Sequence, residues 1–263
     1  KFHFNDKKIS GSLESQFDRY FHIVSPSWLS RNDTSGADFG AGSGRWTEFL
    51  LSQFDIIHAI EPSKEAFEIL EVKFNNNPQV RLHNETINDS SIACNSLDFA
   101  MSLGVIHHVE DSQIALRKIF ESLKPGGTFL GYLYYKLENK SLSYKIIWRF
   151  SDVFRRMISS MPFIIKSSIC DFIAVTIYFP LARLSKLLHL FGISTSNIPL
   201  HHYSDLPLYM MRNDSLDRFG TTLEKRFNKD EIIEMLIRAG ADKESIEFSD
   251  LEPFWTFVAI KAD

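Results

Sequence analysis

The sequence predicts an α/β fold: a mostly parallel sheet with helices on both faces and a large helical insertion. Two observations support this. Strand-like and helical segments alternate between residues 37 and 133, and long aromatic and aliphatic helical patterns replace this alternation from 134 to 218. Alternation is typical of parallel sheets because each parallel pair of strands needs a crossover connection, usually a helix. We divide the chain into a helical lead-in, a core, an insertion and a closing segment, at 1–36, 37–133, 134–218 and 219–263.

The elements are expected in a regular order. Apolar residues spaced by three and four in "LESQFDRYFHIV" predict a helix over 13–24 that leads into the core. The first strand is expected to end near Phe39. Further strands are expected over 56–62, 80–85, 97–103, 127–135, 245–250 and 255–262. Helices are expected over 45–54, 63–74, 111–123 and 228–240, with Ser63 as a start signal and Gly240 as a stop signal.

Composition sets further limits. The 263 residues, 44% of them apolar, are enough for a proper core, and two cysteines indicate neither a disulfide framework nor a metal site. The net charge of −4 gives no reason to expect nucleic acid as a partner. We see neither a signal-peptide pattern nor an uncharged apolar run of about 18 residues that could span a membrane. Together these features predict a cytoplasmic protein.

The stretch "ADFGAGSGRW" (37–46) places three glycines at alternate positions after an acid. A phosphate loop of the Walker type would need Lys followed by Ser or Thr, but Arg45 and Trp46 stand there. A dinucleotide fingerprint would place its third glycine at residue 45, so the spacing disfavours that motif as well. A tight turn between strand and helix without any ligand remains an equal alternative at this point.

Glu61 favours a ligand site. It ends the second expected strand, 17 residues after Gly44, where an open α/β sheet presents a carboxylate at the carboxyl end of a neighbouring strand. A carboxylate in that position can accept hydrogen bonds from both hydroxyl groups of a ribose. The spacing of Asp38, the glycines and Glu61 therefore indicates a nucleoside without a phosphate.

Four motifs between residues 38 and 130 occur in a characteristic order: "DFGAGSGR" (38–45), "IEPS" (60–63), "LDFAMSLGVIHHVED" (97–111) and "LKPGGTFL" (123–130). In these motifs the chain resembles the class I S-adenosylmethionine-dependent methyltransferases, in the branch of the ubiquinone and menaquinone biosynthesis enzymes. The resemblance implies a Rossmann-like, seven-stranded, mostly parallel sheet with the insertion after strand five. It also implies S-adenosylmethionine as cofactor and methyl transfer to a small or lipid-like acceptor by in-line displacement.

The resemblance also assigns cofactor contacts. The methionine end is expected to contact Asp38, Gly40, Ala41, Gly42 and Gly44, and the ribose is expected to contact Glu61 and Pro62. The adenine is expected to contact Glu85, Thr86 and Ile87, and the sulfur is expected to contact Ser102, Leu103 and Gly104. Many members carry Gly-Asp-Ala after strand three, whereas this chain has "HNETI", so the adenine contacts depart from the family pattern.

His107 and His108 are the candidate catalytic residues, because histidine has an ordinary pKa of about 6.5 and can remove a proton near neutrality. The alternative is that the pair caps a helix and packs structurally. The chain lacks the Asp/Asn-Pro-Pro-Tyr/Phe motif that accompanies amino-methylation of nucleobases or amides at the fourth strand. A small-molecule or lipid-like acceptor therefore remains.

The insertion is basic: nine Lys and Arg against three acids lie between Lys136 and Gly192. Two interpretations stay open, namely a helical lid or homodimer contact with a solvated basic rim, and amphipathic helices over 141–192 that lie peripherally on an anionic inner membrane face. We expect acceptor contacts from Tyr134, His201, His202, Tyr203, Tyr209, Arg212 and Arg218. Pairing of the two arginines with Asp214 or Asp217 in a purely structural network is an equal alternative, and no metal site is expected.

Two other functions remain as alternatives. One is a cofactor-binding or partner-binding protein that keeps the fold without turnover, and the other is an NAD(P)-dependent oxidoreductase on the same sheet. The glycine spacing and "HHVED" disfavour the oxidoreductase, but fold analogy alone does not decide activity.

Overall fold

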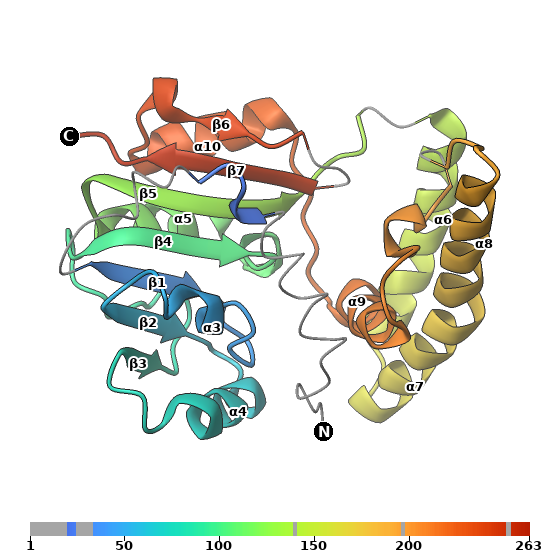
Figure 1. Ribbon diagram of the computed structural model, residues 1–263, viewed down its shortest axis with the longest axis horizontal. Helices are drawn as coiled ribbons and strands as arrows, with labels where there is room; N and C mark the ends of the chain where they lie inside the picture. The colour runs from blue at the N-terminus through green and yellow to red at the C-terminus, as the bar shows by residue number, and fades with distance from the viewer. Residues whose placement is uncertain (1–19, 25–33, 139–140, 196–197, 251–253) are drawn as a thin grey trace. The chain divides into compact units, whose positions relative to one another are not determined.

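The computed structural model describes residues 20–24, 34–138, 141–195, 198–250 and 254–263, and these form two compact units. The α/β unit lies within Leu13–Lys136 and Lys225–Asp263, and the described part of the helical unit lies within Leu137–Glu224 (Figure 1). The insertion expected over 134–218 corresponds to Leu137–Glu224. The segment after the insertion thus returns to the same unit as the segment before it, and each unit is described below by itself.

The α/β unit contains a seven-stranded sheet in the order β3-β2-β1-β4-β5-β7-β6. Strands β1 to β5 pair in parallel, and β7 pairs antiparallel with both β5 and β6. The expected seven-stranded, mostly parallel sheet is confirmed. The strands are β1 (Ser35–Phe39), β2 (Ile56–Ile60), β3 (Val80–His83), β4 (Leu97–Leu103), β5 (Leu123–Tyr134), β6 (Glu247–Phe248) and β7 (Phe254–Ile260).

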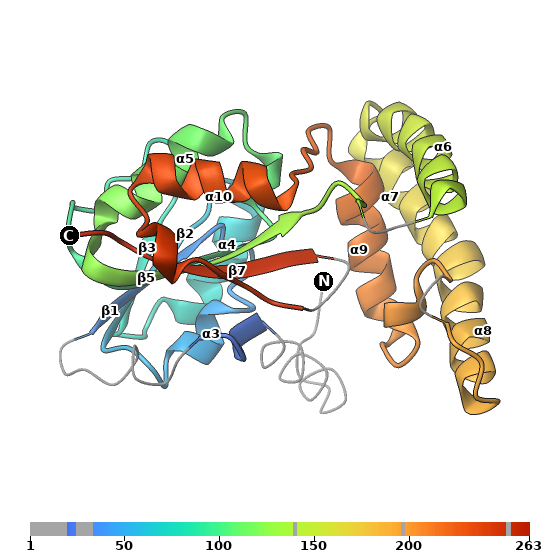
Figure 2. The same ribbon diagram turned by 90° about the horizontal axis from the view of Figure 1, so that it is seen from above.

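Helices cover both faces of this sheet, as expected (Figure 2). Leu116, Ile119 and Leu236, from α5 and α10, are buried in one apolar core with Phe39 and Phe129. The opposite face is covered by α3 and α4. The helices are α3 (Thr47–Leu50), α4 (Lys64–Phe74), α5 (Ser112–Ser122) and α10 (Lys229–Ala239), with short 3-10 helices η1 (Ile106–His108) and η4 (Lys243–Ser245).

Local signals explain where several helices begin and end. The Ser63 hydroxyl accepts a hydrogen bond from the Ala66 amide, as an N-cap does, so α4 begins at the next residue. Asn228 opens α10 with a capping box, and Gly240 ends it in the left-handed region at φ +110°. These starts and stops confirm the sequence signals.

Three expected elements are markedly shorter than predicted, and one of them, the strand expected over 245–250, is confined to Glu247–Phe248. The helix expected over 45–54 is confined to Thr47–Leu50, because the Gln53 amide bonds the Leu50 carbonyl in a tight turn that directs Phe54 into the core. The strand expected over 80–85 ends at His83, where the Asn84 side chain leaves the sheet and donates to the Glu61 carbonyl. Most of the helix expected over 13–24 lies outside the described residues, and Tyr20 and Phe21 form its described helical part.

The helical unit is built around α9, which packs against α6 and α7. Met211, Ser215 and Phe219 recur every four residues and are buried on the inner face of α9. Between residues 201 and 221 the long helix is thus confined to Leu208–Gly220. The elements are α6 (Leu142–Ser159), α7 (Phe163–Ile173), the π-helical η2 (Ala174–Tyr178), α8 (Phe179–Leu190), the 3-10 helix η3 (His201–Tyr203) and α9 (Leu208–Gly220).

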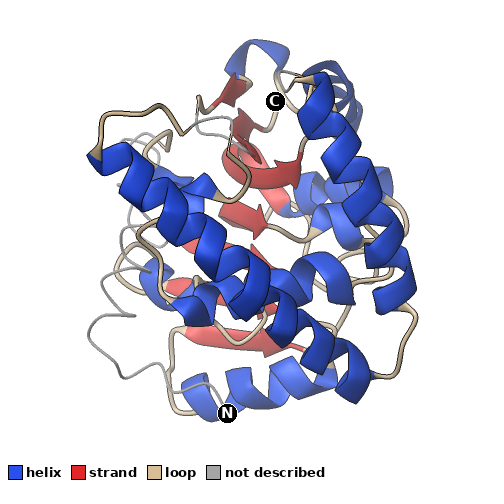
Figure 3. Cartoon of the chain, turned by 90° about the vertical axis from the view of Figure 1, so that its right-hand side faces the viewer, coloured by secondary structure: helices blue, strands red, loops and turns tan. Residues whose placement is uncertain are grey.

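The elements α7, η2 and α8 form one continuous helix, Phe163–Leu190, of 28 residues. By length and composition it could cross a membrane, although Lys166, Asp171, Arg183 and Lys186 leave no uncharged run of 18 residues in it. The helix continues past Pro180 because proline is tolerated where the i−4 hydrogen bond is already disturbed, and the π-helical turn directly precedes it. Figure 3 views this unit from the side on which α6, α7 and α8 lie in Figure 1.

Candidate functional site

The glycine turn follows β1, next to the point where the strand order reverses between β1 and β4. The Gly40 and Ala41 amides donate to the Ile60 carbonyl at 2.8 and 2.9 Å, which fixes the turn to the end of β2. All three glycines have positive φ, at +87°, +57° and +73° for Gly40, Gly42 and Gly44. Ligands of open α/β sheets bind beyond the carboxyl ends of the strands at such a reversal.

The three glycines have different roles. A Cβ on Gly40 would lie 2.3 Å from Val105 Cγ2, and one on Gly44 would lie 2.4 Å from Phe74 Cε2. A Cβ on Gly42, by contrast, would have no heavy atom of the described chain within 4 Å. Gly40 and Gly44 therefore allow close packing, whereas Gly42 faces open space in which a ligand can approach the backbone.

Glu61 lies directly against this space. Its Oε2 accepts from the Gly42 amide at 2.8 Å, and its Oε1 accepts from the Ser63 amide at 2.8 Å. A carboxylate offers about four acceptor sites, so each oxygen of this nearly buried group keeps capacity for one more donor. Two neighbouring hydroxyl groups, such as those of a ribose, match that remaining capacity.

Asp38 supplies a second buried carboxyl at the end of β1. Its Oδ2 accepts from Thr47 Oγ1 at 2.7 Å. Burial raises the pKa of Asp38 to about 7 and the Glu61 charge adds to this, while the Thr47 hydrogen bond and Arg45 act in the opposite direction. A ligand ammonium nearby would favour the ionised form. The site can therefore accept both a cationic amine and a diol.

The expected adenine contacts already have partners within their own part of the chain. Glu85 Oε1 accepts from the amide and hydroxyl of Ser91 at 2.8 and 3.1 Å. The Thr86 hydroxyl donates to Asp89 at 2.7 Å, and Ile87 is buried in the core beside α5. Pro62, expected beside the ribose, is exposed.

The residues after β4 adjoin the glycine turn. Ser102 is fully buried and its hydroxyl donates to the Phe39 carbonyl at 3.0 Å, which ties the ends of β4 and β1 together. Gly104 has φ +81°, and its amide donates to the Tyr132 carbonyl at 3.2 Å, while Leu103 is half-buried. The structure thus brings together the expected methionine-end, ribose and sulfur contacts.

His107 is fully buried, and its ring stacks on Tyr134 with centroids 3.9 Å apart and planes 23° apart. The His108 ring lies 4.2 Å away. Among the described residues, neither ring nitrogen of His107 has a hydrogen-bond partner. Burial, with the nearby His108 and Arg226, lowers the pKa of His107 well below its usual value. His107 is therefore a neutral imidazole near pH 7, placed against an aromatic ring.

Other expected acceptor contacts lie in the helical unit and are engaged there. Tyr203 is buried and donates to Asp214 at 2.6 Å, and Arg212 bonds Asp171 at 2.7 Å through Nε. His201 Nδ1 lies 3.1 Å from the Ile198 carbonyl, Tyr209 lies on α9, and the His202 side chain is outside the described residues.

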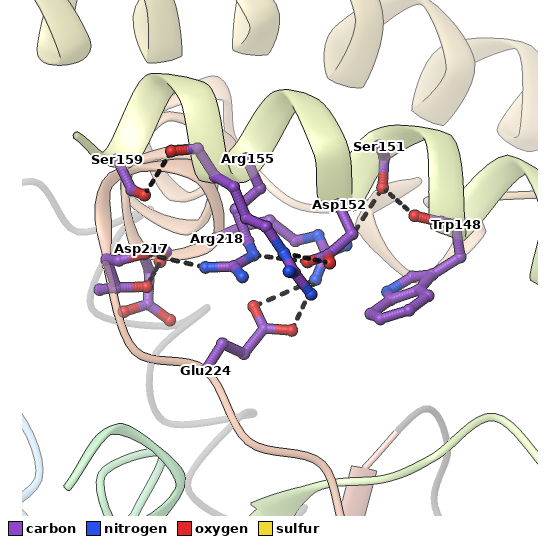
Figure 4. A network of polar contacts seen from close by, with 10 residues as sticks. Trp148, Ser151, Asp152, Arg155, Ser159, Asp217, Arg218 and Glu224 are labelled. Atoms are coloured by element: carbon purple, nitrogen blue, oxygen red, sulfur yellow. Dashed lines mark hydrogen bonds and ion pairs between the residues drawn. The ribbon is translucent and has the colours of Figure 1, made fainter. Parts of the chain in front are cut away.

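Arg218 belongs to a polar network between α6 and the end of α9 (Figure 4). It bonds Glu224 at 2.9 Å and the Ser151 hydroxyl at 3.1 Å, and its guanidinium lies over the Trp148 ring. Glu224 is only 2% exposed, so Arg218 neutralises a buried charge. The observed partners of Arg212 and Arg218 are thus Asp171 and Glu224.

Sequence reasoning missed several residues of the site. Thr47 holds Asp38, Asn84 holds the backbone of Glu61, and Val105 fills the space that Gly40 leaves. Arg226 lies over the Tyr134 ring, 5.1 Å from its centroid. Only Thr47 had a sequence signal, a hydroxyl in the first turn after the glycines. Within the described ranges, no group of three or more His, Cys, Asp or Glu residues could hold a metal ion.

Residues 37–131, about a third of the chain, match the family model of a methyltransferase domain. No relative among curated proteins matches. Solved structures match along nearly the whole chain. One is a Listeria monocytogenes protein described as an S-adenosylmethionine-dependent methyltransferase, at 12% identity and TM-score 0.57, with 95% of this chain and 100% of that chain covered.

Two further structures are similar. The methyltransferase in a complex with the Trm112 activator from Haloferax volcanii has 14% identity and TM-score 0.53, with 96% of this chain and 95% of that chain covered. An S-adenosylmethionine-dependent methyltransferase from Methanosarcina mazei has 14% identity and TM-score 0.54, with 91% of this chain and 98% of that chain covered. At these identities the structures support the fold alone, and the family match supports the domain.

The matched range contains Asp38, the three glycines, Glu61 and the residues after β4. The expected class, enzyme type and cofactor are therefore confirmed for this domain: it is a class I methyltransferase domain that uses S-adenosylmethionine. The ubiquinone-like branch stays a prediction.

Proposed function

We propose that this chain, whose residues 37–131 are a methyltransferase domain, transfers the methyl group of S-adenosylmethionine to a small or lipid-like acceptor. One observation carries the proposal. Gly42 faces open space between the ends of β1 and β2, and the Glu61 carboxylate bonded to its amide keeps acceptor capacity for a ribose diol. This geometry supports a cofactor site, and an assay of methyl transfer separates turnover from cofactor binding alone.

The chain's own residues bind and orient the cofactor. Glu61 is held at both oxygens by backbone amides, so its remaining acceptor sites point in fixed directions before a ligand arrives. Asp38 is placed to take the cofactor's ammonium group, since a nearby cation favours ionisation of a buried carboxyl. When bound, S-adenosylmethionine supplies the activated methyl carbon, so the protein contributes position and the exclusion of water.

We infer that His107 contacts the acceptor. Buried polar atoms are normally hydrogen-bonded, so two ring nitrogens without a partner in the described chain indicate a group that a bound molecule satisfies. Because its pKa is lowered, His107 is neutral near pH 7 and presents one donor and one acceptor nitrogen. It is better suited to orient a hydroxyl or amine by accepting its hydrogen bond than to store a proton. Tyr134 holds the ring in place by stacking.

The aromatic rings at the ends of β4 and β5 support a small or lipid-like acceptor. Tyr132 lies within ring-contact distance of His107, Tyr134 and Tyr20. A site lined by these aromatic rings favours an apolar or aromatic molecule with few polar groups. His201 and Tyr209 stay proposed acceptor contacts. The cytoplasmic location, the lack of a nucleic-acid partner and a homodimer also stay predictions.

Thermal unfolding with added ligands tests the cofactor part of the proposal, because a ligand that binds only the folded state raises the melting temperature. S-adenosylmethionine and its demethylated product should raise it, and NAD should not. Glu61→Ala should weaken binding of the demethylated product about a hundredfold, since hydrogen bonds to a charged group are worth about 1.5–3 kcal/mol each. Glu48→Ala, at an exposed glutamate of α3, is the matched control.

A methyl-transfer screen with radiolabelled cofactor and a panel of phenols, quinols and amphiphilic amines or alcohols tests turnover. Cofactor binding without any transfer would favour the non-catalytic alternative. A melting temperature that rises with NAD but not with S-adenosylmethionine would overturn the proposal.

A further inference from the structure

We propose that the helical unit docks on an anionic lipid surface through the exposed apolar faces of α6 and of the helix Phe163–Leu190, with both helices lying in the plane of the interface. These two faces are called the lipid-docking face below. The inference concerns a surface and does not depend on the reaction proposed above. Scattered exposed apolar residues are normal, but contiguous apolar rows on exposed helices mark interaction sites.

On α6 the apolar row is regular. Side chains spaced by three or four residues share one side of the helix and are about half or more exposed: Leu142, Ile146, Phe150, Val153 and Met157. The buried residues of α6, Asp152, Arg155, Ile158 and Ser159, lie on the opposite side toward α9. A helix of a water-soluble protein normally shows the reverse arrangement, with its apolar row toward the core.

A row of basic residues runs beside this apolar row. Lys145, Arg149 and Arg156 are spaced by four and seven residues, so they share one flank of α6. Arg149 and Arg156 are exposed. An apolar face flanked by lysine and arginine is the pattern of helices that lie at the boundary of headgroups and acyl chains, with the charged ends reaching the phosphates.

The helix Phe163–Leu190 has a second apolar face. Only 17% of its most apolar 18-residue window is buried, and exposed side chains include Ile164, Phe172, Val175, Leu187 and Leu190. Its composition alone would allow it to span a bilayer. Its charged residues, however, contact polar groups of other segments in the same unit.

Four contacts show this. Lys166 donates to the Gly220 carbonyl and Arg183 to the Leu206 carbonyl, while Asp171 pairs with Arg212 and Lys186 with Asp205. A spanning position would carry these charges and their partners into the hydrocarbon, at a high cost. The helix therefore lies along the interface with its apolar side toward lipid.

Charge selects an anionic lipid as the partner. Residues 142–190 contain seven Lys and Arg but only two acids, a net charge of +5, so the rest of the chain carries −9 and the whole chain −4. Both acids are neutralised: Asp152 by Arg155 and Arg156, and Asp171 by Arg212. A second copy docked on this face would place two basic rows together, and like charges would oppose that dimer.

Flotation of the full chain with vesicles tests the proposal. We expect binding to 7:3 phosphatidylcholine:phosphatidylglycerol vesicles and much weaker binding to pure phosphatidylcholine. Arg149→Gln should weaken binding about fivefold, because one basic residue near an anionic surface is worth about 1 kcal/mol. Phe150→Asp and Phe172→Asp should each weaken it about tenfold or more, from lost burial of an aromatic ring.

Matched controls lie on the α/β unit. Arg117→Gln changes an exposed arginine of α5, and Val72→Asp changes a valine of α4 that is 87% exposed. Both should bind like the wild type, and unchanged melting temperatures should show that every variant is folded. Absence of flotation at low salt would overturn the proposal. Equal loss of vesicle binding in the control variants would also overturn it. The same holds if the wild type is a dimer that does not bind vesicles and Phe150→Asp converts it to a monomer.

Discussion

Asp38→Asn should remove a pH-dependent loss of stability from the α/β unit. The Asp38 carboxyl is buried, and its pKa rises from 3.8 to about 7 on folding. The folded state therefore holds this proton more tightly than the unfolded state between those values. Stability from this group is fully present at low pH and is lost as the pH rises through about 7.

The magnitude follows from the shift. In the window where only the unfolded state has lost the proton, the free energy of unfolding falls by about 1.4 kcal/mol per pH unit. Because the folded group is half ionised at pH 7, the total between pH 5 and pH 7 is about 2.3 kcal/mol. Asparagine keeps the size of the side chain and an oxygen that can accept from Thr47 Oγ1, but it does not titrate. The variant should therefore lose about 2.3 kcal/mol less than the wild type over this range.

Urea unfolding at pH 5, 6 and 7, followed by far-UV circular dichroism, measures the difference between the two proteins. Asp230→Asn, at an exposed residue in the first turn of α10, should follow the wild type. With the demethylated cofactor product present, the wild type should gain stability at pH 7 and the Asp38→Asn variant should gain much less. Parallel wild-type and variant curves across the range would refute the reasoning about Asp38.

Three further variants separate packing from function. Gly40→Ala should unfold the α/β unit or cost about 2–3 kcal/mol, from a clash together with positive φ, whereas Gly42→Ala should cost about 1 kcal/mol of stability but abolish most cofactor affinity. His107→Phe should keep or raise the free energy of unfolding by about 1–3 kcal/mol, because it removes buried nitrogens without a partner in the described chain, and should lower turnover. Arg218→Met should cost about 3–5 kcal/mol in the helical unit, because it removes a charged partner of Glu224, which is only 2% exposed.

Chemical denaturation and cofactor titration measure these effects. Equal affinity losses in the two glycine variants would contradict their separate roles, and unchanged turnover in His107→Phe would make that residue a packing residue. Arg212→Met is the control for Arg218, since its pair with Asp171 is exposed and should be worth under about 1 kcal/mol. A similar loss in both arginine variants would contradict the argument from burial.

Much of the α/β unit could be predicted because its signals are local. The strand Leu97–Leu103, the cap at Ser63 and the stop at Gly240 each depend on a few neighbouring residues, whose conformational preferences act within a turn or a strand. The proximity of the glycine turn and Glu61 could also be predicted, since they lie at the ends of adjacent strands. The helix through Pro180 was missed because the π-helical turn that accommodates it has no distinct sequence pattern.

Sequence alone thus determined the sheet and the helices that cover it, because periodicity, caps and strand-end spacing are properties of short segments. Only the tertiary structure decided which glycine faces open space, since Gly40 is closed by Val105, which lies 65 positions further along the chain. The same holds for the burial that makes His107 neutral and for the pairing of Arg218 with Glu224. These properties arise from what surrounds a side chain, and packing between distant segments creates those surroundings.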